Sequence, residues 1–265
     1  MYIRTMSIEN ASKLNHLLTG QPYGVVMQSF WLKQQGYSLG LQQKYRNSKW
    51  LDSIGSGAMV RSGDEVSYEG GIYALQKQTR LNVHPGGKTA LSLLGKSHYL
   101  EMSVRKVTVF GGKGEKLPLW FLKNDWKLKV EYYESSFLPP DEALTEIELK
   151  NFSIKVSTAE RAILECLYIA PKKQELLECY ELMEGLNSLR PVHVQALLEK
   201  CRSIKVKRLF MYMAEKAGHE WFEHLDTTKI DLGQGKRSVV KNGVYDAKYK
   251  ITIPKYLEEY GKRSI

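Results

Sequence analysis

The sequence has few cysteines and no long apolar run. Cys166, Cys179 and Cys201 stand far apart in a chain of 265 residues, with no C-x-x-C pair among them. An odd, scattered set of thiols suits neither a disulfide framework nor a zinc site built from thiolates. No segment approaches the roughly 18 apolar residues of a membrane-spanning helix, and the N-terminus lacks the apolar core of a secretory signal. We expect a protein of the cytoplasm that makes no membrane contact.

The sequence also lacks the motifs of several enzyme classes. It has no G-x-S-x-G elbow and no G-x-G-x-x-G loop after an expected strand. Residues 233–237, GQGKR, lack the spacing of a phosphate-binding loop, and HEWFEH at 219–224 has Glu223 where a zinc motif requires its second histidine. We therefore expect no catalysis, no cofactor and no bound metal.

One enzymatic alternative stays open. Asp141 after a proline, followed by Glu148 and Lys150, mimics the carboxylate and lysine arrangement of metal-dependent nucleases. The motif is degenerate, because Glu146 and Glu148 alternate with apolar residues as they would on an amphipathic strand. A metal-dependent nuclease, or another enzyme that processes nucleic acid, is the alternative function.

Positive charge is concentrated early in the chain. Lysine and arginine total 39 against 29 acidic residues, for a net charge of +10. Residues 1–98 carry eleven basic and five acidic side chains, whereas residues 99–265 carry twenty-eight and twenty-four. Because unbalanced positive charge neutralises phosphates, we expect a nucleic-acid surface in the first part of the chain.

Three helices and a hairpin are expected at the start. The first helix is capped by Ser7 and ends at Gly20, and a second spans residues 23–35, with Val26, Phe30 and Trp31 facing inward before Gly36 ends it. Ser38 caps a third helix that runs to about Ser48, with Leu41 and Tyr45 toward the core. A hairpin around Gly55-Ser56-Gly57 follows. This order is typical of a winged helix-turn-helix.

The rest of the chain mixes helices and strands. The fold class is therefore α+β, with a winged helix-turn-helix domain at 1–96 and a mixed α/β domain at 97–265. Specific local signals are a Ser157/Glu160 capping box and prolines, Pro171 and Pro191, in the first turns of two helices. The expected helices are 64–80 (with Gly70-Gly71 as a weak point), 88–94, 157–168 and the basic 204–217; the expected strands are 104–109, 117–122, 126–133, 238–240 and 249–253.

The third helix is the candidate reading surface for DNA. Arg46 suits guanine, while Gln42, Gln43 and Asn47 suit adenine, and their spacing of three to four residues favours one stripe. Lys44, Lys49 and Arg61 are the expected phosphate contacts, and Ser38 the cap at the DNA-binding end. A solvated helix face is the plain alternative. The preceding glycine turn and the following hairpin favour the reading surface.

A second basic face is possible later in the chain. Its five side chains fall close together around the start of the basic helix, where a solvated helix face is the simpler interpretation. They are Lys200, Arg202, Lys205, Lys207 and Arg208.

The sequence resembles the AbiEi family of antitoxins from bacterial type IV toxin–antitoxin systems, in the form with an N-terminal winged-helix domain. Six segments between about residues 10 and 254 carry the resemblance. They are WLDSIGSGAMVRSGDEVSYEGGIYALQ at 50–76, GGKTALSLLGKSHYL at 86–100, LPLWF at 117–121, STAERAILECL at 157–167, LRPVHVQALLEKCRSIKVKRLFMYMAEKAGHEWF at 189–222 and DLGQGKRSVVKNGVYDAKYKITIP at 231–254.

The resemblance implies a regulator with two roles. Its winged helix would bind inverted repeats in double-stranded promoter DNA and repress its own operon. Its C-terminal part would oppose a nucleotidyltransferase-like AbiEii toxin, with no stable complex required. By position, the DNA-binding role falls on residues 38–49 and the wing at 55–57, although the wing tip has no basic side chain of its own.

Overall fold

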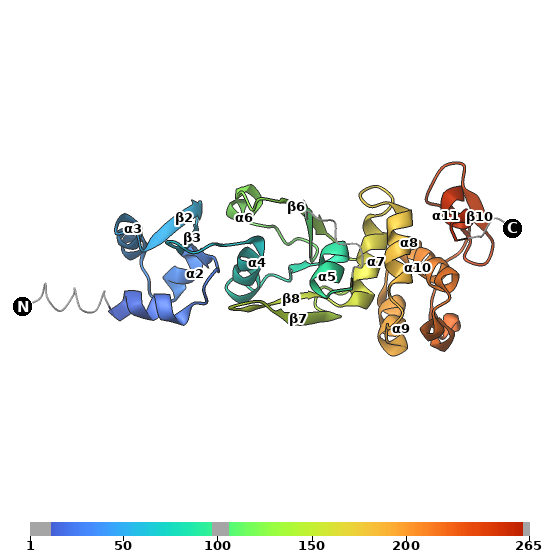
Figure 1. Cartoon of the computed structure of the whole chain (residues 1–265), viewed down its shortest axis with the longest axis horizontal. Coiled ribbons are helices and arrows are strands. Elements are labelled where there is room, and N and C mark those ends of the chain that lie inside the picture. Colours follow the sequence, from blue (N-terminus) through green and yellow to red (C-terminus); the bar gives the residue numbers. More distant parts are fainter. Residues whose placement is uncertain (1–11, 97–105, 262–265) are drawn as a thin grey trace, which may run out of the picture. The chain divides into compact units, whose positions relative to one another are not determined.

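The computed structural model describes residues 12–96 and 106–261 (Figure 1). The chain divides into two compact units, each built from three stretches. Unit 1 comprises Met1–His84, Gly114–Val130 and Glu146–Lys155, and unit 2 comprises Pro85–Lys113, Glu131–Thr145 and Val156–Ile265. The α+β fold class is confirmed. The predicted boundary at residues 96 and 97 stays a prediction, since it adjoins residues outside the described part.

Unit 1 contains a winged helix-turn-helix. Its strands β1 (Met27–Gln28), β2 (Leu51–Gly55) and β3 (Ala58–Arg61) form one antiparallel sheet in the order β1-β3-β2. Met27 lies opposite Met59, and Leu51 opposite Arg61. A tight turn at Ser56 and Gly57 closes the hairpin that forms the wing. In chain order the elements are a helix at residues 12–20, β1 (Met27–Gln28), α2 (Ser29–Gln34), α3 (Leu39–Asn47), β2 (Leu51–Gly55) and β3 (Ala58–Arg61).

Local signals fix the turn before α3. Gly36 has a φ of 87°, a left-handed conformation that glycine adopts readily, and it follows the end of α2 as predicted. The Ser38 hydroxyl accepts a hydrogen bond from the Leu41 amide at 3.3 Å, which confirms the predicted cap. The cap predicted at Ser7 lies outside the described residues.

The second helix begins later than predicted. The sequence suggested a helix from residue 23, but Met27 and Gln28 are extended and pair with β3, and α2 starts only at Ser29. Phe30 was expected to face inward, yet 66% of it is exposed. Strand pairing with a segment about thirty residues away overrides the helical pattern here. The shorter helix leaves Phe30 on the surface.

One apolar core holds the winged helix together. It joins the helix at 12–20 to α2, α3 and the sheet, and Leu14, Leu18, Trp31 and Leu41 pack against its edge. The buried members are Leu17, Met27, Leu32, Tyr37, Tyr45, Leu51 and Met59. This core presents one side of α3 inward and leaves the other free.

Unit 1 also contains α4 (Tyr68–Lys77) and α6 (Leu119–Lys123). Gly70 and Gly71 are not a weak point in α4, because both are buried contacts: a methyl group on Gly71 would lie 2.8 Å from the Phe121 ring. Residues 117–122 were predicted to form a strand, but they form α6. Adjacent Trp120 and Phe121 are both buried, which suits a helical turn and not the alternation of a strand.

Unit 2 is centred on α7 (Ala159–Ile169). Nearly every residue of α7 is buried. Four helices pack around it, namely α5 (Gly87–Leu93), α8 (Leu176–Glu184), α9 (Pro191–Lys200) and α10 (Ile204–Ala217). The predicted capping box is absent: Thr158 occupies the cap position, and the Ser157 hydroxyl donates instead to buried Glu165 at 2.7 Å. Pro191 opens α9 as predicted, whereas Pro171 precedes α8 by several residues.

The remaining elements complete the fold. Val104 in the predicted strand 104–109 lies outside the described residues, and no helix in the described ranges is long and apolar enough to cross a membrane. The strands are β4 (His84–Pro85), β5 (Lys106–Gly111), β6 (Lys129–Glu134), β7 (Leu144–Glu148), β8 (Ser153–Ser157), β9 (Arg237–Ser238), β10 (Val244–Asp246) and β11 (Ile251–Ile253). The α-helices are α5 (Gly87–Leu93), α8 (Leu176–Glu184), α9 (Pro191–Lys200), α10 (Ile204–Ala217) and α11 (Lys255–Glu259). Two short 3-10 helices are η1 (Glu220–His224) and η2 (Thr227–Lys229). Their sheet orders are β4-β5-β6, β7-β8 and β10-β11-β9.

Candidate nucleic-acid interface

A groove of about 250 Å³ runs between α3 and the wing. Figure 1 shows α3 beside the β2–β3 hairpin. Helix α3 forms one wall of the groove and this hairpin forms the other. The start of α2 closes the groove, where the Ser29 amide donates to the Gly57 carbonyl at 2.8 Å. The lining residues are Ser29, Leu39, Gln42, Gln43, Arg46, Ser53, Gly55, Gly57, Ala58 and Met59.

The outer side of α3 carries a linked polar stripe. Gln43, Arg46 and Asn47 are all exposed, as predicted. The Gln43 amide donates to Asn47 Oδ1 at 2.9 Å, and the Arg46 guanidinium donates to Gln43 Oε1. These bonds hold donors and acceptors outward in a defined arrangement. We call Gln43, Arg46 and Asn47 the outer stripe.

Gln42 does not belong to the outer stripe. It was predicted to read bases, but only 2% of it is exposed. Its amide nitrogen donates to the carbonyls of Tyr37 at 2.8 Å and Ser29 at 3.1 Å, and its oxygen accepts from the Ser29 hydroxyl at 2.6 Å. Gln42 therefore fastens α2 to α3, and its amide has no free donor to offer to DNA.

The predicted phosphate contacts separate into two groups. Lys44 and Lys49 are exposed on and just after α3. The Arg61 guanidinium instead turns into unit 1: it donates to the carbonyls of Leu18 and Gln21 and lies 3.9 Å from the centre of the Tyr23 ring. Its Nε and Nη1 atoms are buried. The position of Arg61 does not fit the predicted phosphate contact.

Comparison with known proteins now identifies the chain. The family described as "Transcriptional regulator, AbiEi antitoxin, Type IV TA system" matches residues 104–254, and "Transcriptional regulator, AbiEi antitoxin N-terminal domain" matches residues 10–102. The chain belongs to the AbiEi antitoxin family. Antitoxins of this family are transcriptional regulators of type IV toxin–antitoxin systems.

A solved structure supports the fold. The RV2827C protein from Mycobacterium tuberculosis matches the chain with a TM-score of 0.58 and 12% sequence identity, over 86% of this chain and 85% of that chain. At this identity the similarity concerns the fold alone. A search of curated protein sequences gives no significant match.

Two further residues of the AbiEi chain line the start of the outer side. Leu39 is the first residue of α3 and 61% of it is exposed; Gly40 follows it and is also exposed. The sequence-based prediction passed over both, because it sought polar side chains. The signal was present: with Ser38 as cap and Leu41 and Tyr45 inward, Leu39 falls off the apolar stripe.

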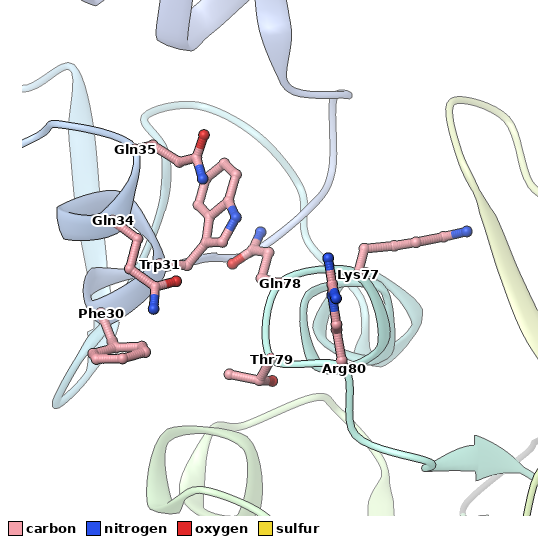
Figure 2. Close-up of a pocket in the computed structure, with 8 residues that line it drawn as sticks. All are labelled: Phe30, Trp31, Gln34, Gln35, Lys77, Gln78, Thr79 and Arg80. Carbon is pink, nitrogen blue, oxygen red and sulfur yellow. The ribbon is translucent and has the colours of Figure 1, made fainter.

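A second hollow in unit 1 of the AbiEi chain lies between α2 and the end of α4. Figure 2 shows this cleft of about 390 Å³, with Phe30 and Trp31 on the α2 side and Arg80 on the other. Lys77 also lines the cleft, and its ammonium group forms an ion pair with Glu146 at 3.2 Å. The cleft was not predicted, because Phe30 and Trp31 were both expected in the core.

The second basic face predicted for the AbiEi chain is largely internal. Lys207 and Arg208 are buried, and Arg208 donates to four carbonyls, including those of Leu232 and Lys250 at 2.7 Å each. Lys205 donates to two carbonyls at 2.6 and 2.7 Å, and burial lowers its pKa to about 8. Lys200 pairs with Glu142. Arg202 alone of the five is exposed without an ion pair in the described part of the chain.

The nuclease candidates do not form a recognisable metal site. Asp141 belongs to unit 2, whereas Glu148 and Lys150 belong to unit 1, and all three are exposed. Within residues 12–96 and 106–261, no group of three or more histidine, cysteine, aspartate or glutamate side chains is placed to hold a metal ion. His219 is buried against Trp221 and bonded to the Met183 carbonyl at 2.7 Å.

Proposed function

We propose that this AbiEi family member binds inverted repeats in its own promoter through the outer side of α3 and so represses its own operon. The observation that carries the proposal is the outer stripe: three exposed, mutually bonded polar side chains on the second helix of a helix-turn-helix, beside a groove whose other wall is the wing. In this motif the second helix enters the major groove.

The side chains of the outer stripe match base edges. A guanidinium such as that of Arg46 donates two parallel hydrogen bonds to guanine O6 and N7, and the Gln43 and Asn47 amides fit adenine N6 and N7. On binding, each exchanges its bond within the stripe for bonds to DNA. Lys44 and Lys49 flank the stripe and supply phosphate contacts that position the helix without selecting sequence.

The antitoxin role rests on the family and not on particular residues. We propose that residues 1–96 form the DNA-binding domain and that residues 97–265 counteract a nucleotidyltransferase-like AbiEii toxin in the cytoplasm, without a stable complex. Co-expression with a nucleotidyltransferase-like toxin of the AbiEii type tests this: the full chain should restore growth, and a chain that leaves the toxin fully active contradicts the proposal.

The promoter claim is tested by the ratio of affinities for promoter and scrambled duplexes. The double variant Gln43→Ala with Arg46→Ala should lose about 1–3 kcal/mol for each lost base contact, and its ratio should fall toward one. The matched control is Gln234→Ala with Arg202→Ala, which removes the same charge and the same side-chain types from exposed positions of unit 2. If the ratio of affinities falls equally in the control variant, or does not fall in the Gln43→Ala with Arg46→Ala variant, the outer stripe is not the surface that reads the promoter.

A further inference from the structure

The first turn of α3 exposes a leucine that the fold does not use. Leu39 is 61% exposed, whereas the core beneath α3 is filled by Tyr45 and edged by Leu41. Leu39 lines the same groove as Gln43 and Arg46, four and seven residues further along the helix. This spacing places the three side chains on one side of α3. An apolar group therefore stands at the beginning of a polar stripe.

The next residue, Gly40, has no structural reason to be glycine. A methyl group built on it meets no atom within 4 Å, and its φ is not among the positive values. Glycine is less favourable than alanine in a helix. One established use of glycine is to let the backbone come close to a ligand, and Gly40 lies on the exposed first turn of the helix that borders the groove.

We propose that Leu39 contacts the C5-methyl group of a thymine in the major groove and that Gly40 lets the first turn of α3 come close to the base edges. The inference rests on the proposed DNA binding and adds its apolar component. Thymine alone presents a methyl group in that groove, and apolar side chains read it. In helix-turn-helix proteins the N-terminal residues of the second helix contact the bases.

The spacing also limits where the thymine lies. Leu39 and Arg46 are seven residues apart, which corresponds to about 10 Å along a helix. Neighbouring base pairs are separated by about 3.4 Å. The thymine read by Leu39 should therefore lie within about three base pairs of the guanine read by Arg46.

The neighbours of Leu39 favour DNA over an apolar protein partner. Apart from Gly40, the exposed residues that follow it on α3 are polar or basic, namely Gln43, Lys44, Arg46 and Asn47. A protein docking site would need a continuous apolar patch. A single apolar group within a stripe of amides and cations matches the mixture of methyl groups, donors and acceptors along the major groove.

Replacement of thymine by uracil tests the proposal, because it removes the methyl group and keeps the base pair. The probe is the duplex upstream of the chain's own reading frame, with each thymine replaced in turn. The unmodified protein should lose about fourfold in affinity at one thymine per half-site, the factor that burial of one methyl group supplies. Leu39→Ala should bind the thymine and uracil duplexes equally.

The control is Val192→Ala, which shortens an exposed apolar side chain near the start of α9. It should keep both the affinity and the uracil penalty. If every uracil duplex binds as tightly as the original while promoter preference persists, the thymine contact is wrong and the proposed function stands. If the protein shows no promoter preference at all, both are wrong.

Gly40→Ala tests the close approach independently. We expect this variant to have a higher thermal midpoint than the original protein and an affinity for the promoter duplex at least threefold lower. A rise in thermal midpoint together with a fall in promoter affinity would show that Gly40 is needed for DNA binding and not for folding. Unchanged affinity together with higher stability would show that DNA does not approach this turn.

Discussion

Two adjacent glutamines in α3 have opposite surroundings. Gln42 is buried among carbonyls of Ser29 and Tyr37, and Gln43 is exposed in the outer stripe. Gln42→Ala leaves these carbonyls without their donor and should lower the free energy of unfolding by about 1–3 kcal/mol. Gln43→Ala should change it by less than about 0.5 kcal/mol, as expected for a surface residue.

Chemical denaturation of both variants measures this difference. Equal losses of stability would contradict the assignment of one glutamine to the core and the other to the surface. Promoter binding gives the reverse order: at a temperature where Gln42→Ala is still folded, it should keep its preference for the promoter, and Gln43→Ala should lose part of it.

Most of the outer stripe was predictable from the sequence, but the burial of Gln42 was not. The apolar pair Leu41 and Tyr45 fixed the inward direction of α3, and this was enough to place Gln43, Arg46 and Asn47 outside. Gln42 directly follows Leu41 in the sequence and is buried, but a polar side chain is normally expected on the exposed side of a helix. Whether a polar side chain finds buried partners depends on α2 and the preceding loop, which no local pattern in α3 reports.

Arg208 is the most heavily bonded cation among the described residues of unit 2. It is 1% exposed, and its guanidinium donates to the carbonyls of Leu232, Gly233, Gln234 and Lys250. Arg208→Met should lower the free energy of unfolding by roughly 2–4 kcal/mol, because the buried carbonyls lose the guanidinium as their donor and, within the described ranges, only that of Lys250 keeps another, the Arg237 amide. Arg202→Met is the exposed control and should be close to neutral. A stable Arg208→Met variant would disprove the internal role.

At the scale of elements, α4 depends on its glycines. A methyl group on Gly70 would lie 2.0 Å from the Gly24 carbonyl oxygen, which is backbone and cannot turn aside. Gly70→Ala should therefore lower the free energy of unfolding by about 1–3 kcal/mol or more. Gly20→Ala, at an open position, is the control. Thermal unfolding of the two variants decides the matter, and equal midpoints would contradict the close packing of α4.

The elements predicted correctly are those whose ends are marked by a capping residue or a glycine turn nearby in the sequence. Ser38, Gly36 and the Gly55–Gly57 turn mark the ends of α3 and the wing within a few residues of sequence. The errors at residues 23–28 and 117–122 have one cause: strand pairing of Met27 with Met59, and burial of Trp120 and Phe121 together, are set by distant segments. Propensity is a weak guide where such contacts decide.

At the scale of the whole molecule, three buried thiols should make the free energy of unfolding fall as the pH becomes alkaline. Burial raises the pKa of Cys166, Cys179 and Cys201, so the folded chain keeps protons that the unfolded chain loses above about pH 8.5. Stability from these groups is complete below that pH and is lost as pH rises. Lys205, with its pKa lowered to about 8, acts in the opposite sense.

The net result should be a fall in the free energy of unfolding between pH 8 and pH 10, because three thiols act in one sense and one lysine in the other. Urea denaturation across this range measures it under reducing conditions. Cys166→Ala removes one of the three contributions, so its curve should be flatter by up to about 2 kcal/mol over the same range. Parallel curves for the two proteins would show that the thiol does not stay protonated in the fold.

The interleaving of the two units was not predictable from the sequence. Residues 114–130 and 146–155 return to unit 1 although they follow the winged helix by more than fifty residues. No composition change or linker marks these returns. Contacts between segments far apart in the chain leave no local trace, whereas the winged helix is assembled from neighbours and was therefore predicted.

The most direct test of the account places a DNA-cleaving reagent on the outer stripe. Because the three native cysteines are buried, a label attaches selectively to Asn47→Cys, or to Val192→Cys in unit 2 as the control. We predict cuts confined to one or two positions in each half-site of the promoter from the first protein and none there from the second. Cuts from Val192→Cys alone, or none from Asn47→Cys on a promoter that it still binds, would contradict the claim that α3 reads the DNA.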